Sequence, residues 1–400
     1  MNPYPRRLRL WAGSLSLVCY GCAGGAAINI VPPRESPELA AHSVEPRVAY
    51  QARLDPVRVP PPEVRLDELL SSPVFGDPVV DDVVAEWVEY WEHDAAAAIP
   101  LFIGRMASFE QTIDSALLVN DLPASLKYLP FIESGYDPVA ASGAHAVGLW
   151  QFMEPTAEQM GLEVTRLLDQ RRDPIRSTEA AVAYLAELRI SFGSWFLALA
   201  AYNAGPTRLR QILRRHAPGL EPSDSLYWTL RPRLPRETQD FVPKLLGAIV
   251  VARRPAARES ELLQPDDPFL FDHVTVPGAT TLDVVAQAAG ATLEDIHRLN
   301  PQFVRGMTPP GRPSALRVPP GKGPTFERNF AEIPPDQRVR FVEHQVEEGE
   351  TLSHIAIRYG VLVADLRDLN PELRPRYLRI GTLLTVPVAP GARGGSSAGT

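Results

Sequence analysis

The C-terminal third of the chain repeats itself, and this repeat constrains the fold more than any other sequence feature. Residues of Thr281–Pro301 recur in Thr351–Pro371 at a constant offset, including an opening Thr-Leu and a closing Leu-Asn-Pro. Each copy begins and ends with a short alternating strand, and two short amphipathic helices lie between the strands. The sequence therefore predicts two small α+β (βααβ) modules, over 270–320 and 341–389, joined by a connector over 321–340.

The region before the repeats has a helical pattern. Apolar residues recur there at spacings of three and four, which places them on one helix face. Ser108-Phe-Glu-Gln111 is a capping box and predicts that a helix begins there, and a further helix is predicted over 124–132. Asp173-Pro174 predicts an N-cap with a first-turn proline, and the apolar run Trp195–Ala204 predicts a buried helix. We expect a mostly α domain over residues 73–260.

The N-terminus is typical of an export signal. Three arginines precede the apolar run Leu10–Val18, and small residues follow it. The run is too short to remain as a membrane-spanning helix. Segment 1–22 is therefore interpreted as a signal that leads to the cell envelope.

The end of this signal loosely resembles a bacterial lipoprotein signal, in which Cys22 would be lipidated. Gly21 precedes it as expected, but Cys19 stands where leucine is usual. Lipidation predicts a membrane anchor at the periplasmic face of the outer membrane, which Ala23 after the cysteine would permit. Ordinary signal-peptide cleavage is the alternative.

Two further segments are predicted to lack a core. Residues 23–72 are rich in proline and charged residues, which favours a linker, either a functional tether or a leader without a role. Residues 390–400 are rich in Gly and Ser and are predicted to be a disordered tail.

Charge and cysteine content exclude some functions. The net charge is -8, which argues against a nucleic-acid partner, because neutralising phosphates needs a basic surface. The chain has only 2 cysteines, so neither a disulfide framework nor a four-cysteine zinc site can form within it. We expect no metal.

A single carboxylate, Glu133, follows an apolar helix and precedes a glycine-rich segment. Walls made by Tyr128, Leu129 and Phe131 would desolvate this carboxyl group and raise its pKa, as a general acid requires. The residues after it include groups that could hold a sugar. Hydroxyl and amide groups would come from Ser142 and Gln151, and flat ring faces from Tyr136 and Trp150. A loop with a capping glutamate is the alternative interpretation.

Two other residues near Glu133 have simpler interpretations. Asp137 could supply a second carboxylate, but its Asp-Pro setting favours a turn residue. His145 has no second histidine at ligand spacing and is interpreted as a solvent-exposed loop residue.

The segment Glu133-Ser-Gly-Tyr-Asp-Pro, with Ser142 and then Gly148-Leu-Trp-Gln-Phe-Met153, resembles the soluble lytic transglycosylase family, in particular its membrane-bound type D branch. Further blocks match in the same order, and they are Asp173-Pro174 with Ser177-Thr178, Ala200-Ala-Tyr-Asn-Ala-Gly205 and Leu234-Pro-Arg-Glu237-Thr. This resemblance implies a lysozyme-like catalytic domain that acts on peptidoglycan.

Transferred residue by residue, the family's catalytic glutamate falls on Glu133. The resemblance also implies a set of substrate-binding residues, namely Ser142, Gln151, Met153, Tyr202, Asn203 and Glu237. Glu154-Pro155 departs from the family, where proline usually follows the methionine directly, and Ala157 stands where glycine is common nearby. These differences put the neighbouring wall of the site in doubt, but not the acid/base.

The two repeats resemble LysM modules, which bind N-acetylglucosamine (GlcNAc) chains. The second repeat, from Val346-Glu-Glu-Gly-Glu-Thr-Leu352, follows the family's opening motif closely and is expected to bind sugar. The first repeat, from Val276-Pro-Gly-Ala-Thr-Thr-Leu282, lacks the acidic residues and carries an insertion around Pro309-Pro310. For this divergent repeat, sugar binding and a packing role both stay open.

A one-carboxylate enzyme must recruit its substrate, because ordinary glycoside hydrolysis uses two carboxylates. The resemblance implies that Glu133 protonates the oxygen between N-acetylmuramic acid (MurNAc) and GlcNAc in peptidoglycan glycan strands. The muramic acetamide then stabilises the anomeric carbon, and Glu133 takes the C6 hydroxyl proton as a 1,6-anhydro ring closes. No cofactor is needed.

Two alternatives to this function stay open. One is a hydrolytic muramidase on the same fold, similar to goose-type lysozymes. The other is a non-catalytic scaffold that binds peptidoglycan.

Overall fold

The computed structural model describes residues 67–387 except 166, 260–262, 264, 279, 310–311, 335–336, 338–340, 360–362, 371–372 and 374–377. The predicted signal segment with Cys22, most of the predicted linker and the predicted tail lie outside the described residues.

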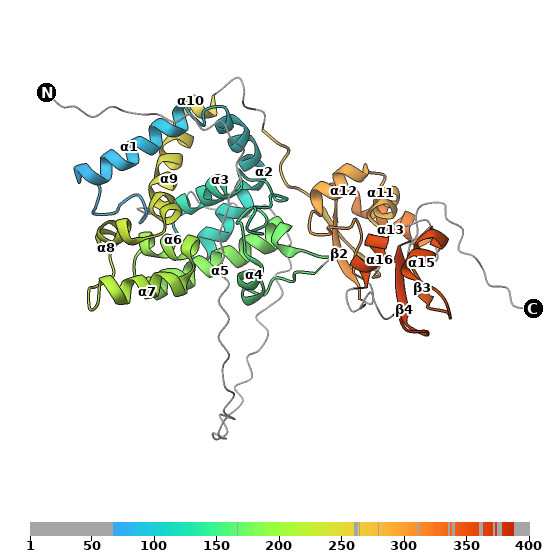
Figure 1. The fold of residues 1–400 in the computed structure, drawn as a ribbon. Coiled ribbons are helices and arrows are strands. Elements are labelled where there is room, and N and C mark those ends of the chain that lie inside the picture. Colours follow the sequence, from blue (N-terminus) through green and yellow to red (C-terminus); the bar gives the residue numbers. More distant parts are fainter. Residues whose placement is uncertain are drawn as a thin grey trace, which may run out of the picture. The chain divides into compact units, whose positions relative to one another are not determined.

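Residues 67–258 form a helical domain, which confirms the mostly α prediction (Figure 1). Residues Trp195–Ala201 of α6 are all buried in this domain. The α-helices are α1 (Pro78–Glu92), α2 (Ala98–Val119), α3 (Leu129–Glu133), α4 (Glu154–Gln159), α5 (Pro174–Phe192), α6 (Trp195–Ala204), α7 (Pro206–His216), α8 (Asp224–Leu230), α9 (Arg236–Ala252) and α10 (Pro255–Arg258). The short 3-10 helices are η1 (Ala124–Tyr128), η2 (Gln170–Arg172) and η3 (Arg231–Arg233).

Helix α1 packs directly on α9. It begins at Asp77, whose carboxylate accepts the backbone N–H of Val79 at 2.9 Å, as an N-cap does. On α9, a Cβ atom at Gly247 would lie 2.9 Å from the Trp87 backbone. A residue without a side chain is therefore needed where the two helices cross.

Two predicted boundaries in this domain are wrong. The chain does not start a helix at Ser108, because the apolar spacing already continues from Ala98 and α2 runs through this point. The Ser108 hydroxyl donates to the Asp267 carbonyl at 2.7 Å instead of capping. The helix predicted over 124–132 is divided into η1 and α3, with Pro130 in the first turn of α3.

The folded domain also begins earlier than the predicted end of the linker at residue 72. Leu69 is completely buried in the core. The carboxylate of Asp67 accepts both the backbone N–H and the hydroxyl of Ser125 at 2.8 Å. Residues 67–72 are thus held by the domain, because a buried leucine and a paired carboxylate outweigh their linker-like composition.

Both repeats adopt the predicted βααβ arrangement. In the first, β1 (Asp272–Val276) pairs antiparallel with β2 (Ser314–Val318), and in the second, β3 (Phe341–Gln345) pairs antiparallel with β4 (Leu383–Pro387). The helices between the strands are α11 (Leu282–Ala289), α12 (Leu293–Leu299), α15 (Leu352–Tyr359) and α16 (Val363–Leu369).

The asparagine of each Leu-Asn-Pro motif joins a helix to the closing strand. Asn300 donates to the carbonyls of Ile296 and Arg317 and accepts the Arg317 N–H. Asn370 makes the same bonds with Leu366 and Thr385. The repeated asparagine is therefore a structural residue in both modules.

The predicted connector over 321–340 contains a helix, α13 (Gly323–Glu332), and this corrects the boundary of the first module. Phe326 and Phe330 are buried in the core of that module, stacked with ring centroids 4.9 Å apart. The backbone N–H of Gly323 donates to the Asp272 carboxylate at 2.9 Å. In the sequence, this segment is interpreted as a connector because it contains prolines and many charged residues between its apolar positions.

Within the described residues, no single helix is long and apolar enough to cross a membrane. Only α5 and α6, taken together as a bent pair, reach the length and apolar composition that a membrane span needs.

The asparagine contacts predict the stability of the second module. Replacing Asn370 with alanine leaves buried backbone groups without partners, and we expect a loss of about 1–3 kcal/mol in the module's unfolding free energy. Hydrogen exchange of residues 341–387 measures it. The variant His354→Ala, at an exposed position of α15, should exchange as the unchanged protein does. Equal protection in both variants would contradict the structural role.

Candidate functional site

Glu133 lies at the C-terminal end of α3, whose other residues turn into the core. Leu129 and Phe131 are buried, whereas Glu133 is half-buried. Burial raises the pKa of Glu133 from its ordinary value of 4.5 to about 8. This carboxyl group is therefore mostly protonated at neutral pH, in agreement with the expectation from its apolar neighbours.

Two charged residues of α9 act on Glu133 in opposite directions. The positive charge of Lys244 lowers the pKa of Glu133, and the negative charge of Glu237 raises it. Burial lowers the pKa of Lys244 itself, while the charge of Glu133 works against that decrease. Glu237, predicted from the family resemblance, is thus brought to the candidate acid/base.

Lys244 is absent from the sequence-based set of site residues. The sequence feature that could have identified it is a single cation within the apolar run Phe241-Val-Pro-Lys-Leu-Leu246. Lysine is rarely buried unless it has a charged partner, so a lysine in such a run indicates a nearby carboxylate.

Tyr202 and Asn203 lie in the last turn of α6 and connect α6 with the residues around Trp150 and with α9. The Tyr202 hydroxyl donates to the Trp150 carbonyl at 2.6 Å, and burial, followed by the charge of Glu133, raises the pKa of this tyrosine. The Asn203 amide donates to Glu237 at 3.3 Å and accepts the hydroxyl of Thr238 at 2.7 Å. Thr238, a residue that the sequence analysis did not single out, thereby fixes the orientation of the asparagine.

Residues 142–153 form a loop that we call the motif loop. The Ser142 hydroxyl accepts the backbone N–H of Ala146 at 3.0 Å, which closes a turn within the loop. Gln151 has a positive φ of 48° and its amide donates to the Gly148 carbonyl at 2.9 Å. Met153 is 44% exposed, whereas its neighbour Phe152 is buried. A non-glycine residue in a left-handed conformation is strained, which is common at functional sites.

A buried guanidinium forms hydrogen bonds with the backbone of the motif loop. Arg171 forms two hydrogen bonds with Asp169, at 2.9 and 2.8 Å, and donates to the carbonyls of His145 and Phe152. Gly148 has a φ of 86°, and a Cβ atom there would lie 1.9 Å from the Arg171 carbonyl oxygen. Only glycine lets the loop approach this backbone.

The two aromatic residues expected to offer ring faces to sugars do not do so, and this expectation is wrong. Trp150 and Tyr136 are completely buried. The Trp150 indole donates to Thr178 at 3.0 Å, and the Tyr136 hydroxyl donates to the Lys127 carbonyl. A glycine-rich setting suggested exposure, but both rings complete the core beneath the site.

The simpler interpretations of two neighbouring residues agree with the structure. Asp137 forms a turn, in which its carboxylate accepts the Val139 N–H at 2.9 Å. His145 is exposed, at a positive φ of 67° in the motif loop.

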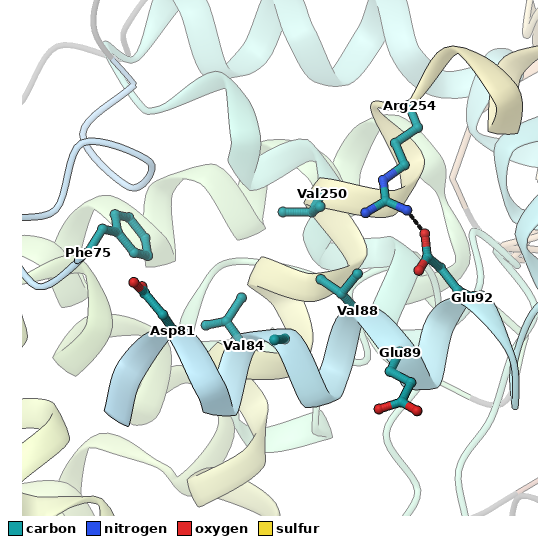
Figure 2. A pocket seen from close by; sticks show the side chains of 9 residues that line it. Phe75, Asp81, Val84, Val88, Glu89, Glu92, Val250 and Arg254 are labelled. Carbon is teal, nitrogen blue, oxygen red and sulfur yellow. Dashed lines mark ion pairs between the residues drawn. The ribbon is translucent and has the colours of Figure 1, made fainter. Parts of the chain in front are cut away.

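A separate surface pocket lies along α1 and α9, on the side of Val84, Val88 and Val250 (Figure 2). Arg254 and Glu92 form an ion pair at its rim. None of the predicted site residues lines it, so the pocket gives no reason to move the candidate site away from Glu133.

The arrangement around Glu133 fits proton transfer. A carboxylic acid that is neutral at neutral pH can donate a proton, and its partial exposure lets a substrate reach it. Tyr202 and Glu237 lie close enough to interact electrostatically with Glu133, and Asn203 is bonded to Glu237. The site therefore has the elements of general acid catalysis.

Three family models match the chain in order. The Transglycosylase SLT domain matches residues 114–219, which include Glu133, the motif loop and Asn203 but not Glu237. The LysM-like domain of lytic transglycosylase MltD matches residues 270–334, and the LysM domain matches residues 344–387. The second of these matches includes α13, in agreement with its packing in the first module.

The chain is also similar to whole proteins. It is 31% identical over 280 residues to "Membrane-bound lytic murein transglycosylase D" of Escherichia coli strain K12, covering 67% of this chain and 60% of that protein. It is 38% identical over 95 residues to a "Putative tributyltin chloride resistance protein" of Alteromonas, covering 24% of this chain and 46% of that protein. The chain thus spans less than two thirds of the length of these relatives.

Among solved structures, the lytic transglycosylase Slt of Pseudomonas aeruginosa, in an inactive E503Q form, matches with 25% identity and a TM-score of 0.30. This match covers 39% of this chain and 24% of that one.

The opposite effects of the two α9 charges give a prediction for Glu133. Glu237→Gln removes a negative charge and should lower the pKa of Glu133, whereas Lys244→Met removes a positive charge and should raise it. Carbon NMR titration of labelled glutamate carboxyl groups measures both shifts, and the signal missing from Glu133→Gln identifies the residue. Shifts of the same sign in both variants would contradict this electrostatic arrangement.

Proposed function

The chain joins a transglycosylase SLT domain to an MltD-type LysM-like domain and a LysM domain, and we propose that it is a lytic transglycosylase of the cell envelope. Its substrate would be the MurNAc-β-1,4-GlcNAc bond of peptidoglycan glycan strands, and its product a 1,6-anhydro-MurNAc end. The observation that carries this proposal is Glu133, a carboxyl group with a pKa of about 8 inside the matched domain.

In the proposed reaction, the protonated Glu133 donates its proton to the glycosidic oxygen as the bond to the anomeric carbon breaks. The acetamide oxygen of the muramic sugar bonds transiently to that carbon and stabilises its positive charge. Glu133, now a carboxylate, accepts the proton of the C6 hydroxyl, whose oxygen closes the anhydro ring. One residue serves as acid and then as base, so the proton count balances without a water molecule.

The surrounding residues would hold the sugar. Asn203, oriented by Thr238, can present its amide to an acetamide or hydroxyl group. Gln151 and Ser142 lie in the same motif loop, and Met153 gives an exposed apolar surface next to them. Tyr202 connects this loop to α6 through the Trp150 carbonyl. We assign these residues and Glu237 to substrate binding.

Glu237 also favours a second candidate function, a hydrolytic muramidase. Its charge acts on Glu133, so the site contains a second carboxylate in addition to Glu133 itself. Two carboxylates are what ordinary glycoside hydrolysis uses, with one of them activating water. In this chain Asn203 donates to Glu237, which ties the carboxylate into the binding network. The products distinguish the two reactions.

The remaining segments would place the enzyme on its polymer. The second C-terminal module, matched as a LysM domain, would bind GlcNAc chains. A lipid on Cys22 would hold the protein at the periplasmic face of the outer membrane, and residues 23–66 would give the reach to the wall. The similarity to a membrane-bound relative supports an envelope location.

Digestion of purified sacculi tests the reaction. The unchanged protein should release muropeptides that are lighter by one water than hydrolysis products. Mass spectrometry of the released fragments measures this difference. Glu133→Gln should slow release by at least about 100-fold, because general acid–base catalysis is lost. Sedimentation with sacculi should persist in this variant.

The matched control is Glu86→Gln, at an exposed position of α1, which should digest sacculi at the unchanged rate. Products with reducing ends only would instead establish the hydrolytic muramidase. Full activity of Glu133→Gln would refute the assignment of the catalytic residue.

The proposed lipid anchor has its own test. Cys22→Ala should move the protein from the membrane fraction to the soluble fraction and abolish labelling by radioactive palmitate. Cys19→Ala removes the neighbouring cysteine and should leave both properties unchanged. Equal labelling of the two variants would contradict lipidation at Cys22.

A further inference from the structure

The two C-terminal modules differ in what their closing strand carries. Arg317 on β2 and Thr385 on β4 occupy equivalent positions, since the backbone N–H of each donates to the structural asparagine of its module. In the first module, however, the arginine side chain bonds both to the Leu299 carbonyl of its own module and to the helical domain. It donates to both carboxylate oxygens of Asp173, each at 2.8 Å, and the two side chains are only 8% and 5% exposed.

Asp173 has a structural role of its own in the helical domain. Its carboxylate accepts the backbone N–H groups of Ile175 and Arg176, which makes it the N-cap of α5. The arginine of the first module therefore pairs with the residue that begins a core helix. Removing one partner of such a buried pair leaves an uncompensated charge, which is strongly unfavourable.

On both sides of this ion pair, each hydrophobic core also contains one residue from the neighbouring domain. Leu168 of the helical domain packs in the core of the first module, and Leu299 of the first module packs in the core of the helical domain. Two backbone hydrogen bonds run alongside, from the Asp169 N–H to the Gln302 carbonyl and from the Val304 N–H to the Leu167 carbonyl. A freely tethered module would not share core residues with its neighbour.

The segment held in this way is the one that supports the motif loop. Asp169 binds Arg171, which in turn donates to the carbonyls of His145 and Phe152 in that loop. From α5, Thr178 accepts the indole N–H of Trp150 in the same loop. The backbone N–H of Asp173 also donates to the Gln170 carbonyl, so Arg317 is linked through residues 169–178 to the motif loop.

We propose that the first module is a fixed part of the catalytic unit and that Arg317 is a positioning residue for the motif loop. Arg317 acts through Asp173 and residues 169–171, and it does not touch the substrate. This role rests on the proposed function for its effect on turnover, but not for its effect on the loop. The first module, which is the divergent repeat, thus has a packing role rather than a role in sugar binding.

The variant Arg317→Thr tests this role, because it places in the first module the residue that the second module has. Hydrogen exchange should become faster in residues 142–153 and 169–178 and stay unchanged in residues 341–387. Turnover on sacculi should fall by up to about 100-fold, as when catalytic groups are misplaced, with little change in KM or in sedimentation with sacculi. Arg312→Thr is the matched control, since Arg312 pairs with Glu163 at the same boundary but is exposed. It should behave as the unchanged protein does.

If Arg317→Thr does not fold, Arg317→Lys keeps the charge but loses the second guanidinium nitrogen, which donates to the Leu299 carbonyl, and it should show the same changes to a smaller degree. Unchanged exchange in residues 142–153 of a folded variant would overturn the proposal, even if the first module itself became looser. Should the unchanged protein cut no glycan, the proposed function fails, and the exchange measurement still decides the role of Arg317.

Discussion

The buried pair of Arg171 and Asp169 is the interaction on which the candidate site depends. A guanidinium deep in a protein needs several hydrogen-bond acceptors, and here it has one carboxylate and two carbonyls. The carbonyls belong to the motif loop, so satisfying the arginine also fixes the loop. The close approach of Gly148 to the Arg171 backbone follows from the same arrangement.

The proton affinity of Glu133 is a balance set by its surroundings. Desolvation at the end of α3 favours the neutral acid, and the two charges of α9 shift the pKa in opposite directions. Because Glu133 is only half-buried, the acid is also reachable. A fully buried carboxyl group would have a similar or higher pKa but could not meet a polymer, so the position at a helix end matters as much as burial.

The two C-terminal modules show how one fold can serve different purposes. Both keep the asparagine that joins a helix to the closing strand, which preserves the βααβ unit. They differ at the strand position next to it, where an arginine in one copy enters a buried ion pair and a threonine in the other does not. The change is tolerated because the strand pairing and the asparagine bonds use backbone groups at this position, whichever side chain stands there.

Local sequence determined much of this protein. Helical spacing predicted the helical domain, and Asp173-Pro174 predicted the start of α5, since both depend on contacts between near neighbours. The repeat predicted both βααβ modules, because the same pattern of strands and helices occurs twice. Glu133 and its raised pKa also followed from an apolar helix in the sequence. The helix α13 was missed because its segment also contains prolines. The continuation of α2 through Ser108 was missed because a capping-box pattern lies inside a helix that begins at Ala98.

Only the tertiary structure decided which distant residues meet. It brought Lys244 and Glu237 to Glu133, buried Trp150 and Tyr136 in the core, and joined Arg317 to Asp173, 144 residues away in the sequence. Nothing in the pattern near any of these residues specifies its partner. The physical reason is that burial and charge pairing are properties of three-dimensional surroundings, whereas a sequence displays directly only the neighbours along the chain.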